Sequence, residues 1–154
     1  MKIGVVSDTH GLLRPEVLPA LEGVELILHL GDVGNAAVLD ELGRIAPVTA
    51  IRGNVDRNGP CSRLPETEVL MLGGRYVYML HDLKELHLDP AAAKFAAVLS
   101  GHTHMPRIEW RGGVLYFNPG SCGPRRFELG ITLGLLTVTE EGEFRPQVVS
   151  LDCG

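Results

Sequence analysis

Residues 2–11 read KIGVVSDTHG, a pattern that the chain repeats twice more before residue 55. Residues 2–7 are rich in Ile and Val, which predicts a short buried β-strand. The strand is followed by Asp8, Thr9 and His10, polar residues that can bind a metal ion or another ligand. The sequence therefore predicts a buried strand that delivers functional groups at its carboxyl end.

The same pattern of an apolar run with a polar end returns at residues 24–32 and 48–54. Between these runs, residues 15–21 and 35–42 have the apolar spacing of helices, and Gly43 is a suitable helix end. An alternation of strands and helices predicts parallel strands joined by right-handed crossovers.

The second half of the chain is richer in hairpins. Gly73-Gly74, Gly112-Gly113 and Glu141-Gly142 each separate two apolar runs. We predict strands over 68–72, 75–80, 97–100, 107–110, 114–117, 131–139 and 144–151, a loop over 57–63 and a short helix over 90–95. The whole chain, residues 1–154, is expected to form one α/β domain of two mixed β-sheets packed together with helices outside.

Composition narrows the class of protein. The 154 residues are 45% hydrophobic and 21% charged, which is typical of a soluble globular domain. The net charge of -5 argues against binding extended nucleic acid, although bound metal ions would reverse the charge locally. The first apolar run is too short for a signal peptide or a membrane span. The scattered Cys61, Cys122 and Cys153 favour reduced thiols and a cytoplasmic location, while a homo-oligomer stays open.

Most of the predicted strands end in residues that bind metal ions in proteins. In open α/β sheets, ligands bind beyond the carboxyl ends of the strands, so these residues can converge. Each one alone has an ordinary explanation as a helix cap, a turn residue or a buried histidine. Their shared position at strand ends, beside glycines, favours one site formed by Asp8, His10, Asp32, Asn54, His81, His102 and His104.

The donor types predict the metal content. Two carboxylates, one amide oxygen and four imidazoles, without thiolate, suit borderline-hard divalent ions. One ion rarely needs seven protein ligands, whereas two ions at roughly 3.5–4 Å that share a carboxylate would use them all. We therefore expect two divalent ions per chain, with Mn²⁺ as the first choice and Fe²⁺, Co²⁺, Ni²⁺ or Zn²⁺ as alternatives.

Five blocks of this sequence resemble those of the calcineurin-like metallophosphoesterase superfamily. The compact length and the turn at residues 118–121 are similar to its small single-domain phosphodiesterase branch. The blocks are Asp8-Thr9-His10, Gly31-Asp32, Gly53-Asn54-Val55-Asp56, His81 and Gly101-His102-Thr103-His104.

The resemblance implies a four-layer α/β/β/α sandwich and hydrolysis of a small phosphate ester by a hydroxide that bridges two metals. It implies that the first metal is held by Asp8, His10, Asp32 and His104. The second would be held by Asp32, Asn54, His81 and His102, with Asp32 bridging. Asp32, Asn54 and His102 are accordingly the expected catalytic residues.

Two positions depart from the family pattern. Val55 stands where many members have a histidine that protonates the leaving group, an aid typically worth roughly 10²–10⁴-fold in rate. We therefore expect a modest enzyme that prefers diesters or good leaving groups. Asp82-Leu83 follows His81 where glycine and histidine are usual, which predicts a different pocket wall beside the second metal.

Several alternatives stay open at this point. His29 is either a partner of the metal ligands or a buried structural histidine. Arg125 and Arg126 either grip the substrate phosphate or are a solvated pair. The chain could also be a non-catalytic protein-binding scaffold, as the retromer subunit of this fold illustrates, or a nuclease of the same superfamily.

Overall fold

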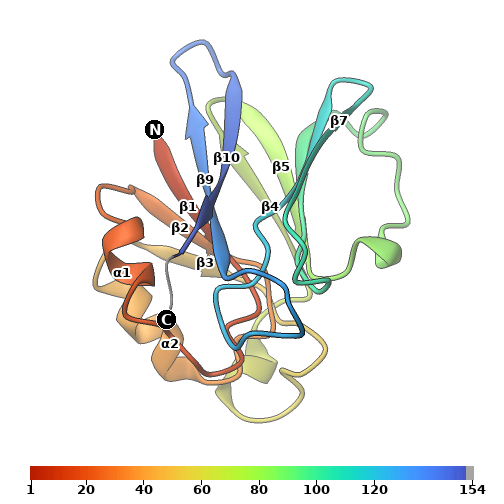
Figure 1. Cartoon of the computed structure of the whole chain (residues 1–154). Helices are drawn as coiled ribbons and strands as arrows, with labels where there is room; N and C mark the ends of the chain where they lie inside the picture. Colours follow the sequence, from red (N-terminus) through yellow and green to blue (C-terminus); the bar gives the residue numbers. More distant parts are fainter. Residues whose placement is uncertain (152–154) are drawn as a thin grey trace.

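The computed structural model describes residues 1–151, which form two five-stranded sheets (Figure 1). The first sheet contains, in spatial order, β10 (Phe144–Ser150), β9 (Thr132–Val138), β1 (Lys2–Val6), β2 (Leu26–His29) and β3 (Val48–Ala50). The second contains β4 (Thr67–Leu72), β5 (Arg75–Leu80), β6 (Phe95–Leu99), β8 (Val114–Asn118) and β7 (Arg107–Arg111). Both sheets are mixed, as predicted.

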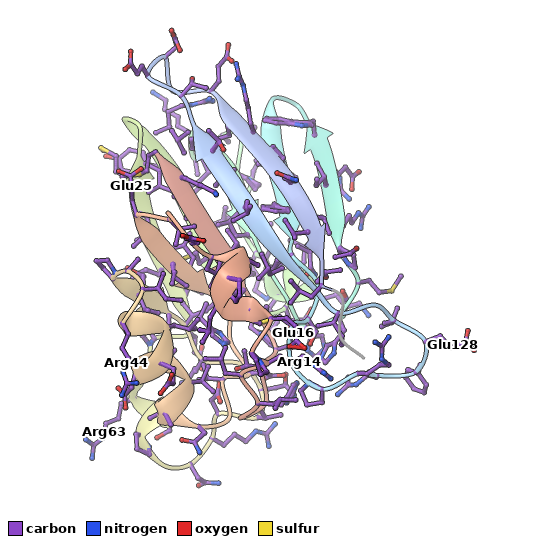
Figure 2. The ribbon with its side chains drawn as sticks, turned by 60° about the vertical axis from the view of Figure 1, so that its left-hand side comes forward. Arg14, Glu16, Glu25, Arg44, Arg63 and Glu128 are labelled. Atoms are coloured by element: carbon purple, nitrogen blue, oxygen red, sulfur yellow. The ribbon has the colours of Figure 1, made fainter. Side chains whose placement is uncertain are left out.

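The first sheet is built from the alternating strands and helices at the start of the chain. β1, β2 and β3 are parallel, whereas β9 joins β1 in antiparallel register and pairs with β10. α1 (Val17–Ala20) and α2 (Ala36–Gly43) lie against the outer face of this sheet (Figures 1 and 2). The Asn35 side chain accepts a hydrogen bond from the Ala37 N–H at the start of α2, which fixes where that helix begins.

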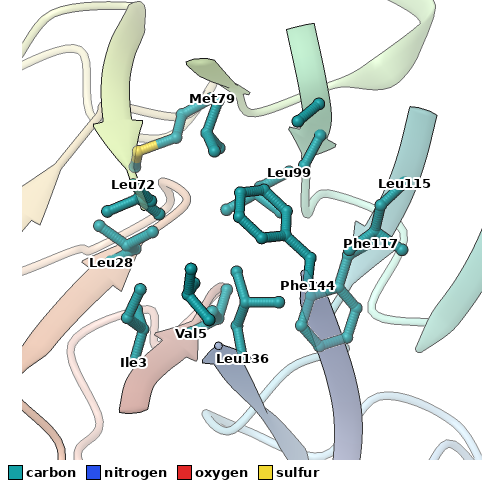
Figure 3. Close-up of a cluster of buried hydrophobic side chains, with 14 of the residues drawn as sticks. Ile3, Val5, Leu28, Leu72, Met79, Leu99, Leu115, Phe117, Leu136 and Phe144 are labelled. Atoms are coloured by element: carbon teal, nitrogen blue, oxygen red, sulfur yellow. The ribbon is translucent and has the colours of Figure 1, made fainter. Parts of the chain in front are cut away.

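The main core lies between the two sheets. Strand residues that alternate inward from both sheets interdigitate there, including Val5, Leu28, Met79, Leu99 and Phe117 (Figure 3). A second buried cluster joins the first sheet to its helices through residues such as Ile27 and Leu42. Because strands that are buried on both faces read as continuous apolar runs, β1 and β2 were visible in the sequence, whereas the residues of β3 are only partly buried.

The outer face of the second sheet is covered by a short segment and not by an α-helix of the described residues. Leu80 and Val98 pack there against Leu83 and Leu86, which belong to the short 3₁₀ turn η2 (Leu83–Glu85) and the segment after it. The layers therefore follow the predicted α/β/β/α order, with a 3₁₀ turn rather than a long helix in the fourth layer.

Two local predictions need correction. The predicted helix over 90–95 is wrong, because residues 90–94 form turns and Phe95 begins β6. The Asp89 carboxylate caps a single turn by accepting hydrogen bonds from the N–H groups of Ala91 and Ala92. The turn ends at Lys94, whose φ of +65° lets the Phe95 N–H donate to the Pro90 carbonyl. The predicted loop over 57–63 contains a 3₁₀ turn, η1 (Pro60–Arg63).

Cys61 and Cys122 are free, buried cysteines, whereas Cys153 lies outside the described residues. Among residues 1–151, no helix is long and apolar enough to cross a membrane.

Candidate metal centre

The backbone around the predicted ligands has an unusual conformation. Five of the seven residues have positive φ angles: Asp8 (58°), His10 (47°), Asp32 (55°), His102 (72°) and His104 (63°). Non-glycine residues seldom adopt this region, and such strain gathers at functional sites, where the surrounding structure holds it in place. The left-handed positions turn each strand exit sharply, so that side chains from different strands face one another.

Hydrogen bonds beyond the strand ends hold these exits together. The N–H of Asp8 donates to the carbonyl of Gly31 at 3.0 Å, and the N–H of His10 donates to the carbonyl of Asp32 at 2.9 Å. Gly31 is required here because its φ is +100° and a Cβ atom would lie 2.7 Å from Nδ1 of His81. The exits of β1 and β2 are therefore fixed against each other and against the second sheet.

The first group of donors consists of Asp8, His10 and His104. Oδ1 of Asp8 lies 3.4 Å from Nε2 of His104 and 3.8 Å from Nε2 of His10. The other oxygen of Asp8 is occupied, since it accepts hydrogen bonds from the Ser7 hydroxyl (2.6 Å) and the His102 N–H (3.0 Å). One carboxylate oxygen is thus anchored, and the other faces three imidazoles, because Nε2 of His81 also lies 3.8 Å from it.

The second group consists of Asp32, His81 and His102, with Asn54 beside them. Oδ2 of Asp32 lies 3.2 Å from Nε2 of His81. Nδ1 of His102 lies 3.4 Å from that same His81 nitrogen and 3.2 Å from Oδ1 of Asn54. All seven predicted residues are therefore brought together, although they span residues 8 to 104.

Asp32 faces both groups. Its Oδ2 atom, 3.2 Å from His81 in the second group, also lies 3.6 Å from Nε2 of His10 in the first. Its Oδ1 atom accepts a 3.0 Å hydrogen bond from the Val55 N–H, which fixes the carboxylate plane. A carboxylate that lies between the two donor groups has the position needed to bind a metal ion in each group.

Several donor atoms of the site are buried without a hydrogen-bond partner among the described residues: Oδ1 of Asp8, Nε2 of His10, and both ring nitrogens of His104. An unpaired buried polar atom costs about 1–3 kcal/mol, so a native site rarely leaves several together. Cations between these atoms would satisfy them, and oxygen and imidazole donors suit divalent ions. The residues present therefore fit metal ions.

The electrostatics of the second group prepare His81 for a metal. Its Nδ1–H donates to the Leu30 carbonyl at 2.7 Å, which leaves Nε2 turned toward Asp32. Burial lowers the pKa of His81, but the contact with Asp32 and the charge of Asp8 outweigh burial and raise it to about 9. Burial raises the pKa of Asp32, but His81 and the Val55 N–H outweigh burial and lower it to about 2. A metal ion at Nε2 would therefore replace a proton.

His29 is fully buried and holds the loops that carry the predicted ligands Asp8, His10 and Asp32. Its Nδ1 accepts from the Gly31 N–H at 3.2 Å, so the neutral ring carries its proton on Nε2, 3.0 Å from the Thr9 hydroxyl. That hydroxyl donates in turn to the Val33 carbonyl. Burial lowers the pKa of His29 to about 4, so the ring is neutral at physiological pH. His29 is a buried structural histidine that joins the loops after β1 and β2.

Sequence reasoning missed the role of Asp56. Its buried carboxylate accepts three backbone hydrogen bonds, from Val33 (3.0 Å), Gly34 (2.9 Å) and Gly53 (2.9 Å). It thereby ties the loop after β2, which carries Asp32, to the loop after β3, which carries Asn54. The only signal in the sequence was its place two residues after Asn54.

Two cavities flank the site, of about 1490 and 670 Å³, and both are lined by Asp82 and His102. Oδ2 of Asp82 lies 3.7 Å from Nε2 of His102, so the unusual residue after His81 forms part of the wall between the cavities. Arg126 lines the larger cavity. Arg125 instead donates to the Leu129 carbonyl at 3.3 Å and is not among the residues that line either cavity.

Comparison with known proteins agrees with this geometry. The model of the calcineurin-like phosphoesterase superfamily domain matches residues 1–141. A probable metallophosphoesterase of Methanothermobacter thermautotrophicus is 39% identical over 132 residues, which cover 79% of this chain and 77% of that protein. A phosphodiesterase of Methanocaldococcus jannaschii is 32% identical and covers 97% of this chain and 99% of its own length.

Solved structures extend the comparison to the whole fold. An archaeal phosphodiesterase superposes with a TM-score of 0.77 at 27% identity, over 97% of this chain and 100% of that one. Vps29 of Entamoeba histolytica, solved with Zn²⁺, superposes with a TM-score of 0.75 at 23% identity, over 97% and 99%. The Vps29 likeness shows the fold alone.

The family model and the two groups of donors together imply a phosphate ester hydrolase that uses divalent metal ions. The chain belongs to the calcineurin-like phosphoesterase superfamily, beside its small archaeal and bacterial metallophosphoesterases and phosphodiesterases.

Proposed function

We propose that the chain is a phosphodiesterase that hydrolyses a small phosphate diester with two divalent ions, Mn²⁺ being the first choice. One observation carries this proposal: Oδ2 of Asp32 faces His10 in one donor group and His81 in the other. The unpaired, buried Oδ1 of Asp8 and Nε2 of His104 support it, since cations would satisfy them.

In this proposal Asp8, His10, Asp32 and His104 hold the first ion, and Asp32, Asn54, His81 and His102 hold the second. The ions would supply Lewis acidity and an activated water nucleophile at neutral pH. The anchored Asp8 carboxylate and the His81 ring, oriented by Leu30, keep the donors in place while the reaction proceeds. His102, which lines both cavities, contacts the substrate.

The reaction adds one water to the diester. The water oxygen bonds to phosphorus, the phosphorus–oxygen bond to the leaving alcohol breaks, and one proton of the water ends on that alcohol. Val55 cannot donate this proton, and a diester with a good leaving group needs it least. Small diesters with good leaving groups are therefore the substrates that suit this site. The proposed location of this activity is the cytoplasm.

The test compares metal-free and Mn²⁺-loaded protein on bis(p-nitrophenyl) phosphate, p-nitrophenyl phosphate and glycerol phosphate. We expect hydrolysis only with metal, fastest on the diester and slowest on the alkyl monoester. Asp8→Asn should abolish it, whereas Asp40→Asn, an exposed aspartate on α2, should not. Rapid turnover of glycerol phosphate would show that another residue supplies the proton.

The alternative function is a non-catalytic scaffold that binds protein partners. It predicts that the chain binds metal without hydrolysing any of these esters. The presence of all seven donors in two adjoining groups favours an enzyme over this alternative. The net charge of -5 likewise favours a small substrate over an extended nucleic acid.

A further inference from the structure

We propose, resting on the phosphodiesterase function above, that the larger cavity binds an aromatic arm of the diester and so defines the substrate class. The cavity measures about 1490 Å³ and lies against His102 of the second donor group. A phosphate held by that group therefore has this space beside it, and an ester arm that leaves the phosphate can occupy it.

The walls of the cavity are mainly apolar and aromatic. Met105 is 56% exposed, and Phe127, at 88%, is the most exposed large hydrophobic side chain among the described residues. Concave sites lined by apolar and aromatic side chains with a few polar groups are typical ligand pockets. The apolar and aromatic lining residues are Leu83, Met105, Pro106, Tyr116, Phe117, Phe127 and Leu129.

Phe127 is held out from the body of the protein by its loop. Its φ angle is +54°, a strained value for an aromatic residue. The loop is closed by a hydrogen bond from Arg125 to the Leu129 carbonyl, and its base by one from Arg14 Nε to the Gly123 carbonyl (2.9 Å). Glu128 lies at the tip of this loop (Figure 2) and lines the larger cavity together with Phe127. The backbone thus presents Phe127 beside the cavity instead of burying it.

One of the charged lining residues, Arg126, favours an aromatic ring over a simple alkyl chain; the others are Asp82, Lys84, Arg107 and Glu128. Arg126 lines the same cavity as Phe127 and forms no ion pair within residues 1–151. A guanidinium group stacks well on an aromatic face, and so does a phenylalanine ring. An aryl or heteroaryl group between Phe127 and Arg126 would gain from both contacts.

The smaller cavity has a more polar lining than the larger one, so the two ester groups of the substrate should differ in polarity. It measures about 670 Å³ and is lined by charged and polar side chains that include Arg52, Arg57, Glu66, Glu85 and His87. A polar arm suits this side of His102, and the aromatic arm suits the other. The structure therefore points to an asymmetric diester with one aromatic and one polar arm.

The kinetic test uses two diesters with the same p-nitrophenyl leaving group, in which the second ester is methyl or phenyl. We expect kcat/KM to be about tenfold or more higher for the phenyl compound, because the additional carbons are removed from water. Phe127→Ser and Met105→Ser should each lower the phenyl-to-methyl ratio at least threefold. Met71→Ser is the matched control, since Met71 lies on β4, is 57% exposed and lines neither cavity.

A binding measurement separates this inference from the proposed function. Calorimetry on Mn²⁺-loaded protein should show tighter binding of diphenyl phosphate than of dimethyl phosphate, and Phe127→Ser should weaken only the former. If no diester is hydrolysed but this binding pattern holds, the proposed function fails and the aromatic subsite stands. Equal ratios in the wild type and Phe127→Ser, with equal binding of the two phosphates, would overturn the subsite.

Discussion

The backbone N–H of Val55 donates a 3.0 Å hydrogen bond to Oδ1 of Asp32, the carboxylate that faces both donor groups. The backbone of position 55 is therefore beside the centre, and Val55 is not among the residues that line either cavity. Its side chain is 47% exposed, so a larger side chain has room. This relationship makes position 55 the place to test how the leaving group obtains its proton.

Val55→His should raise turnover of substrates with poor leaving groups by about tenfold or more, because an imidazole near neutrality can donate a proton in the transition state. Activated nitrophenyl esters should gain little. The measurement is kcat against the pKa of the leaving alcohol, for a series of diesters.

Val69→His is the matched control for this variant, because Val69 is also 47% exposed but lies on β4. Thermal unfolding and metal content should show that both variants fold and load normally. A well-folded, fully loaded Val55→His enzyme without any gain on alkyl leaving groups would refute the missing-acid explanation.

Asp32→Asn should impair metal binding more than His10→Ala. Asp32 faces both groups, whereas His10 belongs to one, so the first variant should lose both ions and the second mainly one. Metal analysis after gel filtration, together with diester hydrolysis, measures both effects. Equal losses in the two variants would count against a shared carboxylate.

Titration of metal-free protein with Mn²⁺ should approach two equivalents per chain. Binding to the folded state alone should also raise the melting temperature, since a ligand at 100 times its Kd stabilises by about 2.7 kcal/mol. Calorimetry gives the stoichiometry and differential scanning calorimetry gives the shift. A clean single site would remove the two-metal hypothesis.

Stability of the metal-free protein should fall between pH 6.5 and pH 4 because of His29. Its pKa is about 4 in the folded protein and 6.5 as a free side chain, so in this window the unfolded state takes up a proton that the folded state does not. The contribution present above pH 6.5 is about 3 kcal/mol at most, and it is lost as the pH falls toward 4.

Urea unfolding at several pH values measures this dependence. His29→Gln should flatten the fall, whereas His87→Gln, a change at an exposed histidine, should keep it. Parallel curves for the wild type and His29→Gln would show that other groups cause the acid sensitivity.

Local patterns were enough to predict most of the fold. Apolar runs placed the strands, and the glycine pairs after Leu72 and Arg111 placed two hairpins that the structure confirms. The helix predicted at residues 90–95 is wrong because Lys94 adopts a left-handed conformation (φ +65°) that ends the turn, and residue composition does not reveal such a conformation.

The sequence by itself determined which residues stand at the ends of the strands, because apolar periodicity and polar breaks are local properties of the chain. It therefore predicted the seven residues that the structure brings together. Only the tertiary structure decided which donors face one another, since Asp8 and His104 meet at 3.4 Å through the packing of two sheets. Three further features depend on loops whose paths are set by distant contacts. They are the hydrogen bonds of Asp56 that join two loops, the position of Asp82 beside His102, and the exposure of Phe127. Strand order and sheet packing convert separation along the chain into proximity, and no short stretch of residues contains that information.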